Sequence, residues 1–172
     1  MIKLPSRPID HAAIISDDGK YRYWLKRGIS MFGEFPVVFI MLNPSTADDI
    51  KDDPTIRRCC GYAHQWHATE MIVVNLFALR ATDPSELWKD GVSDPVGPLN
   101  DEAIKYALEY SRLNSGYVIA AWGNHGAYMD RGDTIIGWGW PLSYLKMNKS
   151  GQPSHPLYLP MNLTPARLAR GK

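Results

Sequence analysis

The sequence predicts an α/β fold in which helices cover both faces of a mostly parallel central sheet, giving three layers. Two runs of apolar residues, 37–42 and 71–79, contain almost no polar residues, which is typical of strands buried on both faces. A third such run covers 117–122. Helical patterns lie between these runs, and strands that alternate with helices favour a parallel sheet. The length of 172 residues fits a single domain comprising residues 1–172.

An N-terminal β-hairpin is predicted before the first buried run. Strand-like runs at 11–16 and 20–27 flank Asp17-Asp18-Gly19, and an Asp-Gly pair between two strands favours a type I′ turn. Apolar and charged residues alternate in the second run. We therefore expect a hairpin at the edge of the sheet, with one apolar face and one charged face.

Two helices are predicted from their caps and their periodicity. Asp53 precedes Pro54, as expected of a helix N-cap followed by proline in the first helical position, and this helix should extend to about Trp66. From Asn100 an apolar stripe with helical spacing continues until Gly116. These helices lie between the buried runs, in the order that a parallel sheet requires.

The first buried run stops abruptly at Asn43-Pro44-Ser45. Proline has no N–H to donate and forces the preceding residue out of the helical region, so a loop must begin here. Asp48 and Asp49 follow in the same small polar loop. Ligands of open α/β sheets bind at the carboxyl ends of the strands, so this loop is the first candidate for a functional site.

Polar side chains also mark the ends of the other strands. Asn75 interrupts the second run and Arg80 follows it, whereas the third run ends in Trp122-Gly123-Asn124-His125. His155 lies in a loop after a fourth predicted strand at 142–147. A buried asparagine without partners costs about 1–3 kcal/mol, so Asn75 must bond to backbone or to a ligand. If these ends converge, they form a pocket suited to a planar, hydrogen-bonding ligand such as a nucleobase.

Composition and charge exclude several classes of protein. A hydrophobic share of 45% and a charged share of 22% are those of an ordinary globular protein, and a net charge of +1 argues against non-specific polyanion binding. The apolar runs are shorter than a membrane span and the N-terminus lacks a signal-peptide core, so we expect a cytoplasmic protein without membrane association. Cys59 and Cys60 are adjacent, which favours buried thiols over a disulfide or a metal site. No cofactor is expected.

Four segments resemble the uracil-DNA glycosylase superfamily, in the branch whose water-activating loop carries asparagine. Asn43-Pro44-Ser45 resembles that loop, and Val74-Asn75-Leu76 resembles the strand whose asparagine reads the uracil edge. Ala121-Trp122-Gly123 and His155-Pro156 resemble the later Trp-Gly strand end and the start of the leaving-group loop. All four occur in the family's order. Other stretches, such as Asp-Asp-Pro-Thr-Ile-Arg-Arg-Cys at 52–59, look closer still to a bacterial and viral domain family of unknown function.

The resemblance implies a DNA glycosylase-like protein that binds a damaged or modified base in nucleic acid, or a nucleoside, and excises the base by N-glycosidic hydrolysis. His155 would donate a hydrogen bond to the base as it leaves with negative charge. Asn43 would hold the attacking water, with help from Asp48 or Asp49 because an amide is not a base. Asn75 would discriminate the edge of the base.

Further contacts to the ligand are expected around these segments. The remaining candidates for base binding are Pro44, Ser45, Tyr62, Trp122 and His125, with stacking from Tyr62 or Trp122, and the candidates for phosphate binding are Arg57, Arg58 and Arg80. Ser45 replaces the glycine of that branch, and the loop after His155 lacks the serine and the wedge that enters the duplex. These departures affect base flipping from double-stranded DNA more than base binding.

Two other functions remain open. A catalytically silent module could bind a modified base or a nucleoside through the same residues. Alternatively, the carboxylates of Asp48, Asp49, Asp52 and Asp53 could hold magnesium in a nucleotide hydrolase. Purely structural roles are the competing interpretation of each candidate, such as a core position for Trp122.

Overall fold

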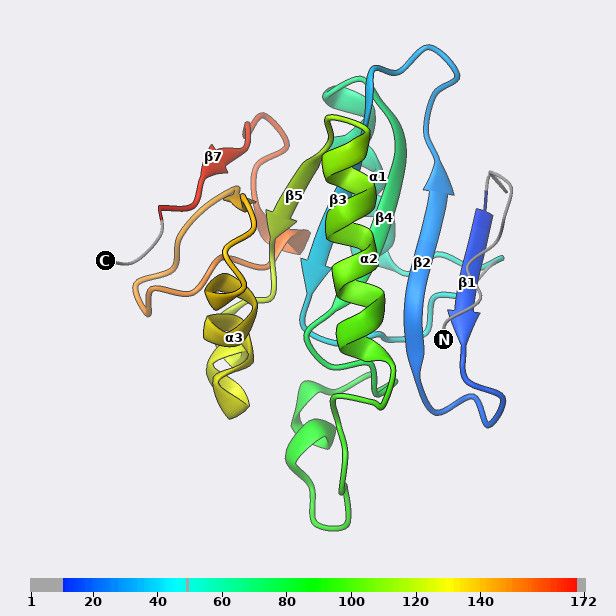
Figure 1. Cartoon of the computed structure of the whole chain (residues 1–172), viewed down its shortest axis with the longest axis vertical. Coiled ribbons are helices and arrows are strands. Elements are labelled where there is room, and N and C mark those ends of the chain that lie inside the picture. Colours follow the sequence, from blue (N-terminus) through cyan, green and yellow to red (C-terminus); the bar gives the residue numbers. More distant parts are fainter. Residues whose placement is uncertain (1–10, 49, 170–172) are drawn as a thin grey trace.

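The computed structural model describes residues 11–48 and 50–169, and Asp49 and the N-terminal segment considered above lie outside the described residues. Within this part of the chain, seven strands form one sheet in the order β1-β2-β4-β3-β5-β6-β7 (Figure 1). The strands are β1 (His11–Ile15), β2 (Arg22–Gly28), β3 (Phe35–Met41), β4 (Ala68–Asn75), β5 (Tyr117–Ala120), β6 (Ser143–Tyr144) and β7 (Ala166–Arg167).

The sheet is mixed, with parallel strands at its centre and antiparallel strands at both edges. Strand β3 is parallel to β4 on one side and to β5 on the other, and β5 is parallel to β6. Strand β2 joins β4 in antiparallel, and β7 joins β6 in antiparallel. The predicted α/β class is confirmed, while the sheet is mixed because the N-terminal hairpin joins it at one edge and β7 joins it at the other.

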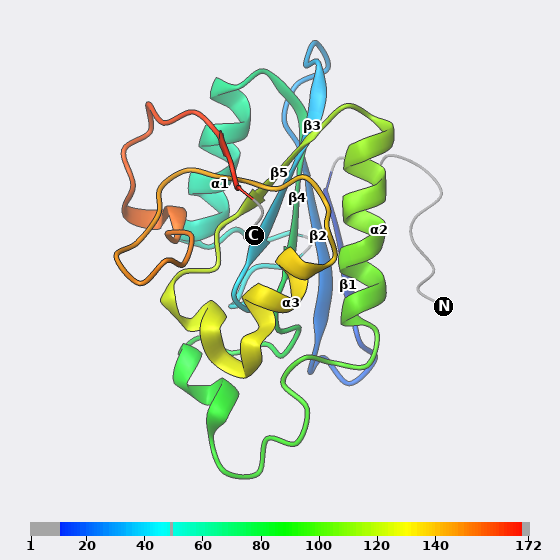
Figure 2. The ribbon, with the colours of Figure 1, turned by 60° about the vertical axis from the view of Figure 1, so that its left-hand side comes forward.

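Two helices sandwich the sheet, as Figure 2 shows with the sheet seen close to edge-on. Helix α1 (Pro54–Gln65) packs with Val37, Phe39 and Met41 of β3, and helix α2 (Asn100–Leu113) packs with the residues between them on the opposite face. Strand β3 is therefore buried on both faces, as its unbroken apolar run predicts. Shorter elements are α3 (Arg131–Gly137) and the 3₁₀ turns η1 (Pro84–Trp88), η2 (Asn124–Asp130) and η3 (Pro156–Tyr158).

The hairpin differs from its prediction in two ways. The Asp-Gly loop is wider than a type I′ turn, because the Ser16 N–H bonds to the Tyr21 carbonyl at 2.9 Å and, within this loop, only Gly19 has a positive φ, +72°. A type I′ turn needs positive φ at both central residues. Moreover, β2 lies between β1 and β4 and is not an edge strand, and Arg22 and Trp24 of its predicted charged face are buried, 2% and 5% exposed.

The helix predictions hold closely, whereas the fourth strand does not. Asp53 caps α1 by accepting from the Ile56 N–H at 2.8 Å, as its position before proline predicts. Strand β6 is much shorter than the predicted strand at 142–147. Both cysteines are free, and Cys59 is buried. No helix in residues 11–48 and 50–169 is long and apolar enough to cross a membrane.

Candidate functional site

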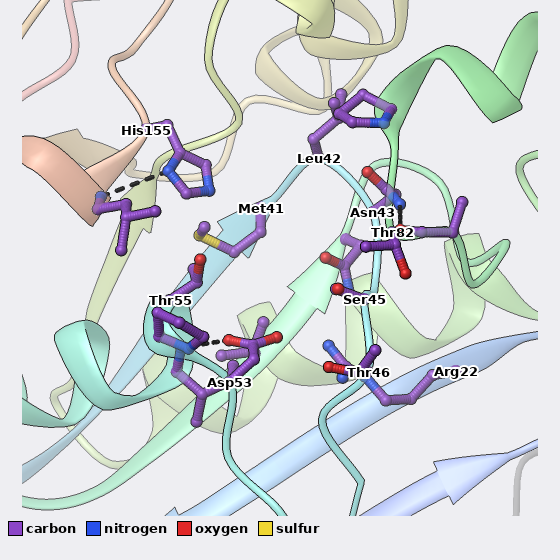
Figure 3. A pocket seen from close by; sticks show the side chains of 17 residues that line it. Arg22, Met41, Leu42, Asn43, Ser45, Thr46, Asp53, Thr55, Thr82 and His155 are labelled. Atoms are coloured by element: carbon purple, nitrogen blue, oxygen red, sulfur yellow. Dashed lines mark hydrogen bonds between the residues drawn. The ribbon is translucent and has the colours of Figure 1, made fainter.

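A pocket of about 360 Å³ lies at the edge of the sheet where β3 and β4 end, beside the N-terminus of α1 (Figure 3). Its size is at the lower end of the range for small-ligand sites, roughly 300–1,000 Å³. Six separate segments of the sequence contribute to it. The lining residues are Arg22, Met41, Leu42, Asn43, Ser45, Thr46, Asp53, Pro54, Thr55, Ile56, Val73, Asn75, Ala81, Thr82, Pro84, His155 and Leu157.

Asn75 presents an unused amide to this pocket. Its side chain is buried, with the residue 1% exposed, and neither the amide nitrogen nor the amide oxygen has a hydrogen-bond partner among the described residues. The backbone of Asn75 is nevertheless fixed, because the Asn100 Nδ2 group at the start of α2 donates to its carbonyl at 2.9 Å. The side chain is thus buried in the wall of the pocket, and its donor and acceptor are not used by the described residues.

Asn43 occupies the loop after β3 with its amide in a defined orientation. Its nitrogen donates to the Ala81 carbonyl at 2.8 Å and to the Pro44 carbonyl at 3.1 Å. Both partners can only accept, so the nitrogen must face them. The Oδ1 atom is therefore left as an acceptor without a protein partner among the described residues, which suits it to hold a water molecule.

His155 faces the same pocket from the loop before η3. Its Nδ1 atom accepts from the Leu157 N–H at 3.3 Å, which leaves the proton of the neutral ring on Nε2. Burial lowers the pKa of His155, and the negative charge of Asp53 opposes this shift only in part. His155 is thus a neutral donor. Its backbone packs on Gly123, whose φ of +74° and ψ of −172° form a conformation nearly restricted to glycine.

Two ionisable residues of the pocket, Asp53 and Arg22, were not predicted to contact a base, and Asp53 was considered for a site only as a magnesium ligand. Asp53 caps α1 with Oδ1, and in Figure 3 its other carboxylate oxygen points toward the side that Ser45, Thr46 and Arg22 line. Its place before proline indicates the cap but gives no sign of the pocket. Arg22 begins β2, and because β2 is antiparallel to β4, this first residue lies at the edge where β4 ends. A search limited to the carboxyl ends of strands therefore misses Arg22.

The two aromatic candidates for stacking lie in the core instead of the pocket. Trp122 is 1% exposed, and its indole N–H donates to the Gln152 side-chain oxygen at 2.7 Å. Gly126 packs so closely on the indole that an added Cβ would lie 1.9 Å from ring atom Cδ1. Tyr62 is buried on α1 and donates to the Pro160 carbonyl at 2.7 Å. Neither ring has a face available to a base.

The remaining base-binding candidates divide between the pocket and its surroundings. Ser45 lines the pocket, whereas Pro44 is buried, does not line it, and accepts from the Ala81 N–H through its carbonyl at 2.9 Å. His125 is exposed at η2, with its ring 5.1 Å from that of Trp88, and it is not among the lining residues.

The described acidic residues near α1 bind different partners and do not form one cluster. Asp48 accepts from the Ile50 and Lys51 N–H groups at 2.9 and 2.7 Å, and these bonds lower the pKa of its carboxyl group. Asp52 pairs with Arg27 at 2.8 Å. In the part of the chain that the structure describes, no group of three histidine, cysteine, aspartate or glutamate residues could hold a metal ion. Asp48 is thus directed to its own loop and does not line the pocket.

The three arginines considered for phosphate binding have different surroundings. Arg57 is exposed and donates to the Asp52 carbonyl at 2.9 Å, while Arg58 donates to the Leu159 carbonyl and lies over the Tyr62 ring. Arg80 lines a second hollow, which shares residues 45, 46, 81 and 82 with the pocket. Its Nε atom is buried without a partner among the described residues. Of the three, only Arg80 adjoins the pocket.

Comparison with protein families gives one match, to a family described as a protein of unknown function (DUF1643), over residues 22–157. The match spans more than three quarters of the chain. The chain belongs to DUF1643. The DUF1643 region begins at Arg22 and ends at Leu157, both of which line the pocket, so the whole pocket lies within the family match. No curated protein and no solved structure matches the chain.

Proposed function

We propose that the chain binds a nucleobase, within a nucleic acid or a nucleoside, in the pocket at the ends of β3 and β4 and hydrolyses its N-glycosidic bond. The observation that carries this proposal is the amide of Asn75, which has no partner among the described residues, in the same pocket as the neutral Nε2–H donor of His155. A buried amide with both a free donor and a free acceptor complements a ligand edge that offers both an acceptor and a donor. Pyrimidine and purine bases have such edges.

The chemistry of base excision fits the residues that the pocket contains. Negative charge develops on the departing base, and a hydrogen bond from His155 Nε2 would stabilise it. A single positioned donor of this kind contributes about 3–4 kcal/mol to the transition state. The other requirement is a water at the sugar carbon, which Asn43 Oδ1 would orient. Asp53 is the carboxylate in the pocket that would take the proton of this water, in place of Asp48.

Charge around the pocket supports a nucleotide or a single-stranded ligand. Arg80 adjoins the pocket and could contact a phosphate, whereas the net charge of the chain is only +1. The loop after His155 forms the short turn η3 in place of a wedge. We therefore propose a base in single-stranded nucleic acid or a free nucleoside in preference to a base stacked in a duplex.

A strand-cleavage assay tests this proposal. Oligonucleotides carrying uracil, a thymine mismatch or a hypermodified pyrimidine are incubated with the protein, treated with alkali and examined for strand breaks. Nucleosides are assayed in parallel for release of the free base. We expect His155→Ala to reduce the rate by roughly 10²–10³-fold, as for loss of one positioned donor, and Asn43→Ala to reduce it as well. Arg112→Ala, on the exposed side of α2, serves as the control and should retain the rate.

A non-catalytic base-binding module is the second candidate. It is favoured by the place of Asp48, because the carboxylate expected beside Asn43 bonds to its own loop instead. For such a module, a nucleoside at about 100 times its dissociation constant raises the stability of the fold by about 2.7 kcal/mol, while no strand break or free base forms. If neither stabilisation nor cleavage occurs with any base, both functions are wrong.

A further inference from the structure

Strand β2 contains two buried arginines that differ in one respect. Arg27 is 1% exposed, and its guanidinium pairs with the Asp52 carboxylate at 2.8 Å. Arg22 is 2% exposed, yet among the described residues its guanidinium makes a single hydrogen bond, from Nη1 to the Ala47 carbonyl at 2.7 Å. Its Nε atom has no partner, and no carboxylate among residues 11–48 and 50–169 forms an ion pair with it.

The guanidinium group of Arg22 lies at the pocket. Arg22 lines it, and Figure 3 shows the guanidinium beside Thr46 on the side of the pocket opposite His155. Burial lowers the pKa of Arg22 to about 10, and the more distant charge of Asp53 opposes the shift. The group stays protonated at neutral pH. A buried cation without a paired anion is unfavourable, and an anion brought by a ligand would remove the unfavourable energy.

We propose that Arg22 binds an anionic group, a carboxylate or a phosphate, carried by the ligand whose base contacts Asn75. This deepens the proposed function and rests on it, because the heterocycle and the anion would belong to one molecule. The planar guanidinium can donate two parallel hydrogen bonds to either kind of oxyanion. The hydroxyl groups of Ser45 and Thr46 line the same side of the pocket and add donors.

Asp53 makes the position of the anion specific. Its carboxylate lines the same pocket and repels a second negative charge, so the anionic group of the ligand must lie on the Arg22 side. An asparagine at this position would cap α1 as well as aspartate does, since both side chains accept from backbone N–H groups. The substitution Asp53→Asn should therefore tighten the binding of acidic ligands more than that of neutral ligands.

Calorimetric titration with matched neutral and acidic probes tests the proposal. One pair is uracil and 5-carboxyuracil, which places the charge on the base, and the other is uridine and uridine 5′-monophosphate, which places it on the sugar. We expect the acidic member of one pair to bind roughly 10- to 100-fold more tightly than the neutral member, as for a charged hydrogen-bonded contact. The pair that shows the difference identifies which group Arg22 binds.

Variants of Arg22 test whether this residue causes the preference for the acidic probe. In Arg22→Gln the preference for the acidic probe should disappear, in Arg22→Lys it should be partly kept, and in the control Arg112→Gln it should be unchanged. Equal affinity of the wild-type protein for both members of each pair would overturn the proposal, whether or not the variants fold. A preference that survives in a folded Arg22→Gln protein would overturn it too.

The outcome separates this inference from the proposed function. If the neutral bases bind through Asn75 and acidic groups add nothing, the base-binding function stands and the role of Arg22 is wrong. If no probe binds, both proposals fail.

Discussion

At the scale of single residues, the site is defined by which buried polar groups have partners. Asn75 and Asn100 are both buried, and the Asn100 nitrogen donates to the carbonyls of Asn75 and Leu76 at 2.9 and 3.0 Å although its oxygen has no partner among the described residues, whereas neither amide atom of Asn75 has one. An amide used by the fold stabilises it, and an amide left unpaired destabilises it. The same residue type therefore has opposite effects at these two positions.

Matched leucine substitutions test this contrast. Asn75→Leu should raise the free energy of unfolding of the unliganded protein by about 1 kcal/mol, because it removes an unpaired buried amide, and it should abolish base binding. Asn100→Leu should lower the free energy of unfolding by about 1–3 kcal/mol, because it leaves carbonyl groups unpaired. Urea denaturation of both variants measures the effects. A loss of stability in Asn75→Leu equal to that in Asn100→Leu would show that Asn75 is structural.

The pH dependence of stability tests the state of His155. Because burial lowers the pKa of His155 in the folded protein, the unfolded chain binds the proton more readily. The neutral ring thus stabilises the fold above the unfolded pKa of about 6.5, and this contribution is lost as the pH falls through the lowered folded pKa.

His155→Asn keeps an acceptor for the Leu157 N–H and removes the titrating ring. Thermal unfolding from about pH 8 to about pH 5 should show a smaller loss of stability in this variant than in the wild-type protein. Parallel curves for the two proteins would contradict the assignment of a buried neutral ring.

The sequence predicts polar residues at strand ends better than it predicts their surroundings. Asn75 stands out because an amide interrupts an apolar run, and His155 because it resembles a leaving-group histidine. Trp122 also follows a strand, but packing of Gly126 on its ring, which depends on the chain folding back at η2, places it in the core. Arg22 looks like the charged side of an edge strand, since nothing local shows that β2 is covered on both faces.

At the scale of elements, backbone conformation at the end of β5 positions His155. Gly123 is the N-cap of η2 and has a nearly glycine-only φ and ψ, and its N–H donates to the Pro153 carbonyl at 2.9 Å. This bond attaches the loop that carries His155 to the central sheet. The geometry of the pocket therefore depends on a residue that does not line it.

Gly123→Ala should lower the free energy of unfolding by about 1–3 kcal/mol, because alanine is strained in this conformation. It should also weaken base binding, because the loop with His155 moves. Gly137→Ala in α3 is the matched control: an added Cβ there meets nothing within 4 Å, so stability should stay the same or rise. Unfolding curves and base titrations of both variants check this. Unchanged stability of Gly123→Ala would show that the strain is absent.

Helices can be predicted from signals in the local sequence, whereas irregular segments cannot. The Asp-Pro pair and the apolar periodicity act within one or two turns, so α1 and α2 were predicted close to their observed bounds. The segment 124–137 lacks such signals: η2 and α3 are joined through a left-handed backbone at Met129 and Asp130. Their arrangement depends on contacts with distant parts of the chain, such as that of Tyr128 with Phe77.

At the scale of the whole molecule, three of the four segments predicted to converge line one pocket, whereas the end of the third buried run, 122–125, does not line it. The ends of β3 and β4 meet because these neighbours are parallel, and β2 adds its first residue because it runs the other way. His155 reaches the pocket from a loop well beyond β6. Asn43, Asn75 and His155 therefore share one pocket, which is the arrangement that base binding requires.

The most direct test of the central claim is a crystal structure of the protein soaked with a panel of nucleobases and nucleosides. Our account predicts a base in the pocket whose edge bonds to both amide atoms of Asn75 and whose carbonyl oxygen lies about 3 Å from His155 Nε2. A base bound elsewhere, or a pocket that stays free of every base at saturating concentration, would contradict it.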